Sequence, residues 1–245
     1  MNQNTIKIYL FAALMAATYS LTAQNILVGL GSGGGTFEMS HEKAFNQSTV
    51  NLLPFKPVLM DNFPPYFFYK AEVLYSFPHT FAVGVNVSTT STGSRLSLAD
   101  YSGKYTMDQQ HSGIFPGIKI LLGEAPGKSN GLNLSLEGGF AFSTMKVDEK
   151  ATVLEETVTN NDKFKATGFY AQPGLCYFIN ISSKVKICAN VSYYKGFEKG
   201  YHVPGERDQK IVNSETFVPI RAQWDGIRCG ITAYWNFPGI SKPTE

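Results

Sequence analysis

Eight stretches of the chain alternate apolar and polar residues, and the connections between them alternate long and short. In the clearest stretch, Val185–Tyr194, the odd-numbered positions are apolar and the even-numbered positions are mainly polar. A period of two is typical of a β-strand with one apolar and one polar face. Repeated eight times, the pattern predicts an all-β fold: an eight-stranded antiparallel up-and-down transmembrane β-barrel with short periplasmic turns and four long outer loops.

The predicted strands are separated by turn-forming or polar residues. They cover Asn25–Phe37, Tyr66–Phe77, Thr80–Thr89, Gly113–Leu122, Leu132–Lys146, Lys165–Asn180, Lys184–Lys195 and Arg221–Phe237. The long connections are predicted as loops over Glu38–Pro65, Thr90–Ser112, Val147–Phe164 and Gly196–Ile220.

Aromatic residues gather near both ends of the predicted strands, with aliphatic residues between them. Tyr75, Phe81 and Trp235 lie near the turns, and Phe142 and Phe169 lie near the long loops. Two aromatic belts around an aliphatic band are expected where a barrel meets the two interfaces of a bilayer. The alternative is that these rings form the core of a soluble sandwich or a lipocalin-like barrel.

The polar face of the strands carries mostly small residues with a few charges between them. Such a face suits the narrow lumen of an eight-stranded barrel, where buried charges persist only if they are paired. We expect a lumen network that leaves no continuous water path, formed by Lys70, Glu72, Lys119, Glu137, Lys186 and Arg228. The alternative for each charge is a solvated position at a barrel end.

Two local features depart from the regular pattern. Pro116 and Pro173 fall inside predicted strands, each followed by glycine, and this predicts a β-bulge at each site. The first strand contains Gly31 and Gly33–Gly35, which either allow a close approach to the last strand where the barrel closes or mark a flexible entry to the first loop.

The N-terminus has the pattern of a secretory signal peptide. Lys7 precedes an apolar run over Ile8–Ala17, which is too short to cross a bilayer as a helix, and small residues lead to Ala23. We expect a signal peptide over residues 1–23 and one barrel domain over residues 24–245; the alternative is an uncleaved anchor helix. Charged residues are only 16% of the chain, against about 25% in typical soluble proteins.

Three cysteines are too few for a disulfide framework. Cys176 and Cys188 lie six residues on either side of Ser182, in a tight turn, so a simple hairpin places them opposite each other on the polar face. We predict a cross-strand disulfide there, with two free lumen thiols as the alternative. Cys229 lies on the opposite phase and is expected to face lipid.

The signal peptide, the eight alternating strands and the aromatic end Tyr234-Trp235-Asn236-Phe237 together resemble the small eight-stranded outer-membrane β-barrel proteins, above all the OmpA-like and OmpW-like barrels of Gram-negative bacteria. The resemblance covers nearly all of the mature chain and lies in its pattern. It implies a location in the cell outer membrane, with outer-membrane lipid and the barrel-assembly machinery as partners.

The candidate chemistry is sparse. Three of the four histidines, His41, His111 and His202, fall in or beside the long loops, and His79 falls in a turn. Ser40-His41-Glu42 has the residue types of a catalytic triad, but adjacent residues do not form one. We find no motif of a hydrolase, metalloprotease or nucleotide-binding protein, so we expect no enzyme activity, no cofactor and no metal. The near-zero net charge gives no indication of nucleic acid binding.

We therefore expect a non-enzymatic barrel with a structural or surface-interaction role through its long loops, which bind an unknown extracellular or small-molecule ligand. One alternative is a narrow channel or transporter for small solutes, including apolar ones that leave through the wall, as the resemblance to OmpW-like barrels implies. A second alternative is a lipid-modifying outer-membrane enzyme.

Overall fold

The computed structural model describes residues 25–77, 81–101, 103–123, 130–153 and 156–238, and the predicted signal peptide lies outside these ranges. One helix and eleven strands are described. They are β1 (Asn25–Gly35), α2 (Ser40–Leu52), β2 (Val58–Asn62), β3 (Tyr66–Ser76), β4 (Phe81–Asp100), β5 (Gly103–Gly123), β6 (Gly131–Val153), β7 (Glu156–Asn180), β8 (Val185–Glu198), β9 (His202–Val203), β10 (Glu206–Lys210) and β11 (Gly226–Pro238).

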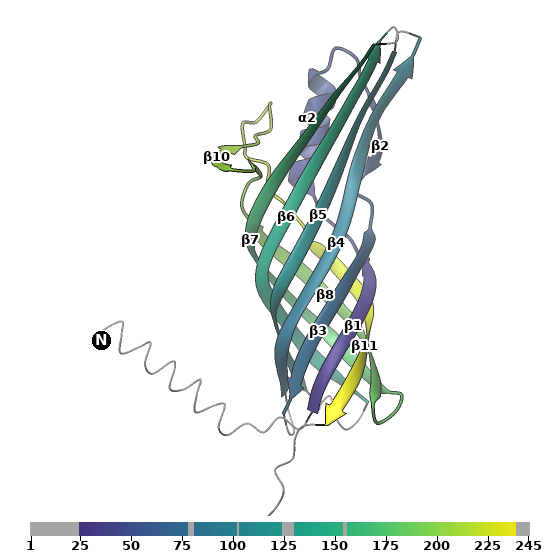
Figure 1. Ribbon diagram of the computed structural model, residues 1–245, viewed down its shortest axis with the longest axis vertical. Helices are drawn as coiled ribbons and strands as arrows, with labels where there is room; N and C mark the ends of the chain where they lie inside the picture. Colours follow the sequence, from purple (N-terminus) through teal and green to yellow (C-terminus); the bar gives the residue numbers. More distant parts are fainter. Residues whose placement is uncertain (1–24, 78–80, 102, 124–129, 154–155, 239–245) are drawn as a thin grey trace, which may run out of the picture.

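Eight of these strands close into an antiparallel ring in the order β1-β3-β4-β5-β6-β7-β8-β11, and β11 pairs back onto β1. The predicted eight-stranded antiparallel barrel is therefore confirmed. Figure 1 shows the ring as a tilted cylinder, with β1 and β11 side by side.

The outer wall of the ring is apolar. Val85, Ile118 and Phe169 are 61%, 57% and 59% exposed, while their neighbours along the strands turn inward. We call this surface the apolar belt; its members include Leu30, Tyr69, Val85, Val87, Ile114, Ile118, Leu134, Leu136, Phe140, Phe142, Phe169, Leu175, Val191, Phe197 and Ile231. A closed ring of hydrogen-bonded strands with an apolar exterior is the form in which β-structure crosses a bilayer.

Two of the predicted loops are instead strands. The stretches Thr90–Ser112 and Val147–Phe164 continue the β4–β5 and β6–β7 hairpins, and these strands reach 20 to 25 residues. A bilayer needs only about ten residues per strand. The excess comprises residues 90–101, 103–112, 143–153 and 156–167 and forms a four-stranded sheet beyond the belt that we call the blade (Figure 1). Both faces of much of the blade are polar, so the sequence lacks the alternation that reveals a half-buried strand.

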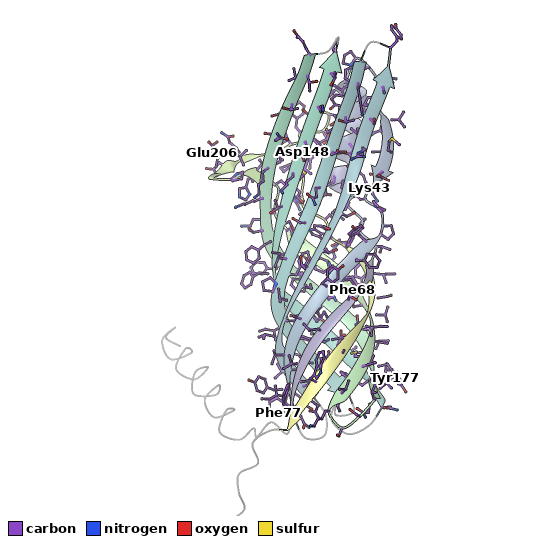
Figure 2. The ribbon with its side chains drawn as sticks, turned by 45° about the vertical axis from the view of Figure 1, so that its right-hand side comes forward. Lys43, Phe68, Phe77, Asp148, Tyr177 and Glu206 are labelled. Carbon is purple, nitrogen blue, oxygen red and sulfur yellow. A yellow bond between two sulfur atoms is a disulfide. The ribbon has the colours of Figure 1, made fainter. Side chains whose placement is uncertain are left out.

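The predicted first loop, Glu38–Pro65, also contains regular structure. It forms α2 and then β2, which pairs with the blade part of β4. The last long connection contains β9 and β10, which project sideways from the molecule (Figure 1). In Figure 2, Phe77 and Tyr177 lie at the turn end of the barrel, and Asp148 and Lys43 lie at the blade end.

The predicted β-bulges at the two prolines are wrong. Pairing between β5 and β6 stops at Ile114 and resumes at Gly117 in the same register, so no residue is inserted at Pro116. The β7–β8 ladder likewise skips Pro173 without a shift. Each proline interrupts the strand pairing on one side of its strand only. On the other side, Pro116 pairs with Val87 and Pro173 pairs with Leu136.

Glycine permits closure at the β1–β11 seam. Gly33 lies opposite Gly230, and a Cβ at Gly33 would meet the carbonyl oxygen of Cys229 at 2.1 Å. At the neighbouring Gly34 a Cβ would meet nothing within 4 Å. The ring of Phe68 fills the lumen side of the seam, against both Gly33 and Gly230.

Candidate functional site: the lumen, its cap and the blade

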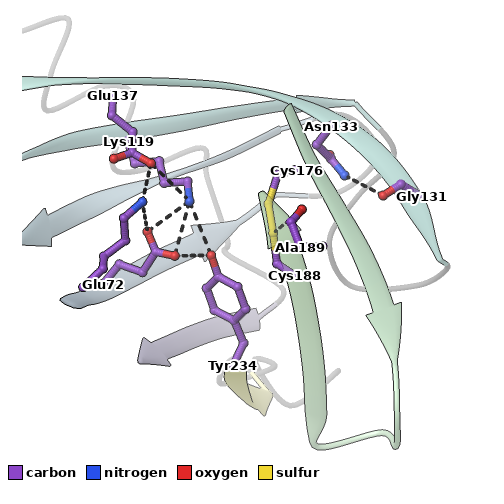
Figure 3. Close-up of a disulfide and its surroundings, with 10 residues drawn as sticks. Glu72, Lys119, Gly131, Asn133, Glu137, Cys176, Cys188, Ala189 and Tyr234 are labelled. Carbon is purple, nitrogen blue, oxygen red and sulfur yellow. Dashed lines mark hydrogen bonds and ion pairs between the residues drawn. A yellow bond between two sulfur atoms is a disulfide. The ribbon is translucent and has the colours of Figure 1, made fainter. Parts of the chain in front are cut away.

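Four charged side chains meet in the middle of the lumen. Lys70 Nζ lies 2.6 Å from Glu137 Oε1, and Lys119 Nζ lies 3.0 Å from Glu72 Oε2. The two pairs are cross-linked, because Lys119 is also 3.4 Å from Glu137. Figure 3 shows this cluster with Tyr234, whose hydroxyl donates to Glu72. We call Lys70, Glu72, Lys119 and Glu137 the ion cluster; its formal charges sum to zero.

Strand register explains how the cluster assembles. Lys70 and Glu72 are two residues apart and face the same side of β3, while Lys119 lies directly opposite Glu137 on β5 and β6. Gly84, the β4 partner of Lys119, has no side chain to occupy the space beside it. Asn86 donates to the second oxygen of Glu137 at 2.7 Å. Every member of the ion cluster is buried, and buried charges require compensation. The four charges compensate one another and are further stabilised by hydrogen bonds.

The other two predicted members of the network lie outside the ion cluster. Arg228 is six residues from Tyr234 toward the blade end of β11, and its guanidinium carbon is 4.0 Å from the centre of the Tyr194 ring. It donates to Gln172 at 3.4 Å. Lys186 is buried on β8, opposite Tyr234 in the β8–β11 register. The structure thus brings four of the six residues together and separates two of them.

Cys176 and Cys188 are bonded to each other on the lumen side, at the turn end of the barrel (Figure 3). Their Cα atoms are 6.0 Å apart. The β7–β8 register pairs Cys176 with Asn190, so the two cysteines are diagonal neighbours and not directly opposite as expected. They pack with Leu27, Leu74 and other apolar residues that fill this end of the lumen. Cys229 is free and exposed.

Aromatic rings fill the lumen at the blade end of the belt. The rings of Tyr170 and Tyr194 stack with centroids 5.2 Å apart, and Phe115 contacts both. Trp224 packs edge-on against Phe115 and donates its indole N–H to Ser143 at 2.8 Å. These five residues and the ion cluster occupy the lumen at two successive levels.

Above the rings, α2 caps the barrel with a polar face. Its buried residues are Glu42, Asn46 and Ser48, and the exposed fraction of Leu52 is 62%. Asn46 donates to Ser94 on β4 at 2.8 Å, and Glu42 accepts the backbone N–H of Gln223 at 3.2 Å. The second carboxylate oxygen of Glu42 has no partner among the described residues. Burial raises the pKa of Glu42 to about 8.

His111 lies beneath this cap and not in a loop. Its Nδ1 is 3.0 Å from the hydroxyl of Tyr201, and its ring packs edge-on against Phe63. Burial lowers the pKa of His111 to about 3, so the imidazole is neutral. Ser40 donates to Gln223, so the Ser40-His41-Glu42 sequence does not assemble as a triad. His79 lies outside the described residues.

The two edges of the blade differ. The β4 edge is covered by β2, with pairs from Val58 to Asn62. On the β7 edge, no described strand pairs with Glu156–Phe164; the first contact on that side is Lys165 with His202. The side chains from Glu156 to Lys163 are all exposed. The sequence gives no indication of this edge, because its polar residues over Val147–Phe164 predict a loop.

The described residues form neither a metal site nor a membrane-spanning helix. No group of three His, Cys, Asp or Glu residues in the described part of the chain is arranged to hold a metal ion. The one described helix is neither long enough nor apolar enough to cross a membrane.

The closed ring, the apolar belt and the filled lumen define an outer-membrane-type β-barrel. No family model matches the chain, and no curated protein matches it by sequence. Among solved structures, the chain is similar to Ail, the attachment invasion locus protein of Yersinia pestis, at 13% identity and a TM-score of 0.34, with 87% of this chain and 97% of that chain covered. A second Ail structure, in complex with the heparin analogue sucrose octasulfate, gives 12% identity and a TM-score of 0.36 over 87% and 97% of the two chains.

The chain is also similar to a major outer membrane protein from Thermus thermophilus. The identity is 9% and the TM-score 0.45, over 86% of this chain and 99% of that chain. These identities are too low to transfer a role.

Proposed function

We propose that this protein is a surface-interaction protein of the outer membrane, in which the barrel is the anchor and the blade is the binding element. The observation that carries the proposal is the open β7 edge over Glu156–Phe164. A free edge presents unpaired backbone N–H and C=O groups, to which an extended polypeptide adds as a further strand. The partner is therefore an extended protein segment, recognised mainly through its backbone.

The covered β4 edge supports this assignment. Because β2 pairs with Ser94–Ser97 of β4, the longest run of unpaired strand backbone among the described residues of the blade lies on β7. The long ladders between β4 and β7 hold that edge on a rigid sheet, which reduces the entropy lost when a partner is ordered against it.

In this proposal the blade faces the cell exterior and the turns face the periplasm. Residues 1–23 direct export, the barrel-assembly machinery inserts the chain, and outer-membrane lipid surrounds the apolar belt. We expect the protein in the outer-membrane fraction, with a migration in gel electrophoresis that changes on heating. Recovery of the protein in the soluble periplasmic fraction would contradict this location.

The edge is tested with two adjacent proline variants, Val158→Pro and Thr159→Pro. Amides of adjacent residues in a strand point to opposite sides, so one of the two donates to β6 and the other faces the free edge. Hydrogen exchange of the β6–β7 hairpin identifies which variant leaves the hairpin intact. That variant is the informative one, and the other serves as the matched control.

Linear peptides are first selected from a random library against the wild-type protein in nanodiscs. We expect the selected peptides to lose affinity for the variant that keeps the hairpin but lacks the free amide. The proposal fails if the selected peptides bind the wild type no better than they bind a barrel whose blade is replaced by short turns. It also fails if the peptides bind the informative variant as tightly as they bind the wild type.

The other two candidates fit the geometry less well. A narrow channel requires both the ion cluster and the stacked rings to move aside. A lipid-modifying enzyme requires a nucleophile and a base at the belt, whereas His111 is enclosed beneath α2. An unchanged lipid A mass spectrum after replacement of each histidine is the result expected here.

A further inference from the structure

A basic patch lies on the outer face of the barrel wall, next to the apolar belt. Lys146 on β6 and Lys163 on β7 are direct partners in the β6–β7 register. Lys165 lies two residues nearer the belt on β7, and Lys199 follows β8 beside Thr167. We call these four lysines the lysine patch; all four side chains are exposed.

The patch directly borders the belt. Lys199 donates its backbone N–H to Thr167, which is the register partner of Phe142, and Lys165 lies opposite Thr144. Phe142 and Phe169 are the last outward-facing apolar residues of β6 and β7 before the blade, at 49% and 59% exposure. The lysines therefore project at the depth where a bilayer changes from hydrocarbon to headgroups.

The positive charges are not neutralised within the protein. In the described residues no carboxylate oxygen lies within 4.0 Å of the ammonium group of any of the four lysines. Asp148 is two residues from Lys146 on the same face and is the nearest acidic position along that strand. The whole chain has a formal net charge of only +2, so four lysines in one patch are a marked concentration of charge.

The pairing of Lys146 with Lys163 has an energetic consequence. Like charges directly opposite each other destabilise an antiparallel pair. An anion bridging the two ammonium groups removes this repulsion. Long lysine side chains next to a bilayer also extend toward the headgroup layer, which brings their charges to the lipid phosphates.

The geometry points to the lysine patch as a binding surface for the phosphate groups of outer-leaflet lipids. The occupant is a lipid headgroup, because the patch is continuous with the belt that the same lipid's hydrocarbon covers. Bound phosphates fix the depth and rotation of the barrel and therefore the direction in which the blade points. This inference is independent of the partner proposed for the β7 edge.

The test uses the full barrel purified in a neutral detergent and three probes: bisphosphorylated lipid A, dephosphorylated lipid A and inorganic phosphate. The variant is Lys163→Glu/Lys165→Glu. The matched control, Lys104→Glu/Lys150→Glu, makes the same charge change on the outer face of the blade, farther from the belt. Native mass spectrometry measures the lipid retained, and heat-modifiable migration establishes that each variant is folded.

We expect the wild type and the control to retain bisphosphorylated lipid A, and the patch variant to retain at least about tenfold less. Dephosphorylated lipid A should be retained weakly and equally by all three proteins, and sodium chloride should release the phosphorylated form. Equal retention of the two lipid forms by the wild type would overturn the inference, and so would equal losses in both variants. Displacement of the lipid by low inorganic phosphate would also overturn it, because it would assign the patch to a soluble anion.

Discussion

Lys119 and Glu137 face each other across the β5–β6 ladder, and their charged atoms lie 3.4 Å apart inside the barrel. Glu137 is also bonded to Lys70 at 2.6 Å, so one carboxylate compensates two ammonium groups that come from β3 and β5, two strands separated by β4 in the ring. This relationship ties β3, β5 and β6 together across the lumen and makes Glu137 the residue on which the ion cluster depends.

Replacement of Glu137 by alanine should therefore destabilise the barrel strongly. It leaves two buried lysines with Glu72 as their only acidic partner in the ion cluster, and an uncompensated buried charge costs about 3 kcal/mol. Urea unfolding in lipid vesicles measures the loss. The double variant Lys70→Met/Glu137→Met leaves Lys119 with Glu72 as a neutral pair and should be clearly more stable than Glu137→Ala. Equal stabilities of the two variants would contradict the assigned role of Glu137.

The seam between β1 and β11 offers a matched pair of glycine substitutions. Gly33→Ala should lower the yield of folded barrel sharply, since its Cβ would collide with the backbone of Cys229. Gly34→Ala should fold normally, because the added methyl group points into open space. The fraction of heat-modifiable protein after refolding compares the two. Similar yields from both variants would show that close approach of the backbones is not what the glycines provide.

The Cys176–Cys188 bond joins two residues that are 12 positions apart in the sequence and so closes a short loop. In the chain-entropy model such a loop lowers the entropy of the unfolded state and contributes about 3 kcal/mol of stability. The Cys176→Ser/Cys188→Ser variant should therefore unfold at lower urea concentration, with the barrel still formed. Mass mapping without reduction checks the bond itself, and recovery of both thiols free and alkylated would refute it.

The docking of α2 should depend on pH in a specific way. Glu42 has a pKa of about 8 when docked and 4.5 when free, so its contribution to docking is complete below pH 4.5 and is lost as the pH rises to 8. His111 has a pKa of about 3 when buried and 6.5 when free, so its contribution is complete above pH 6.5 and is lost as the pH falls to 3. The two trends cancel between pH 4.5 and 6.5, which predicts a plateau with weaker docking on both sides.

Fluorescence of Trp224 reports on the cap, since Trp224 is fully buried next to Phe37. The Trp235→Phe background removes the second tryptophan. On this background Glu42→Gln should abolish the change above pH 6.5 and turn the plateau between pH 4.5 and 6.5 into a rise with pH, while the slope below pH 4.5 stays the same. If the Trp224 fluorescence of Glu42→Gln changed at alkaline pH as it does in the Trp235→Phe parent, Glu42 would not govern the docking of α2.

Alternation of side chains was sufficient to predict the ring, because each of its strands separates lipid from lumen. Beyond the belt that contrast weakens. A few apolar residues, Leu96, Met107, Met145 and Val147, are buried on the inner face of the blade, but polar residues such as Thr92, Ser94 and Gln109 are buried beside them, so the apolar period is too broken to predict the strands. The sequence does not predict the helix, for a related reason. Its buried positions, Glu42 and Asn46, are polar, so α2 has no apolar stripe that a sequence pattern would reveal.

The alternation along the strands predicts which residues face the lumen, but it does not predict which of these residues meet one another. Register is set by pairing along the whole ladder, and only the register shows that Lys119 meets Glu137 while Arg228 meets Tyr194. The open β7 edge was likewise invisible in the sequence, since it depends on which strands stop at the belt and which continue.

We propose that the barrel is a filled anchor and that activity resides in the blade. Electrical recording across planar bilayers containing the purified protein tests this claim most directly. Because the ion cluster and the packed rings of Phe115, Tyr170 and Tyr194 occupy successive levels of the lumen, we predict no conductance above that of the bare bilayer. Steady unitary conductance that changes on substitution of Glu137 would contradict the account and would establish a water-filled path through the barrel.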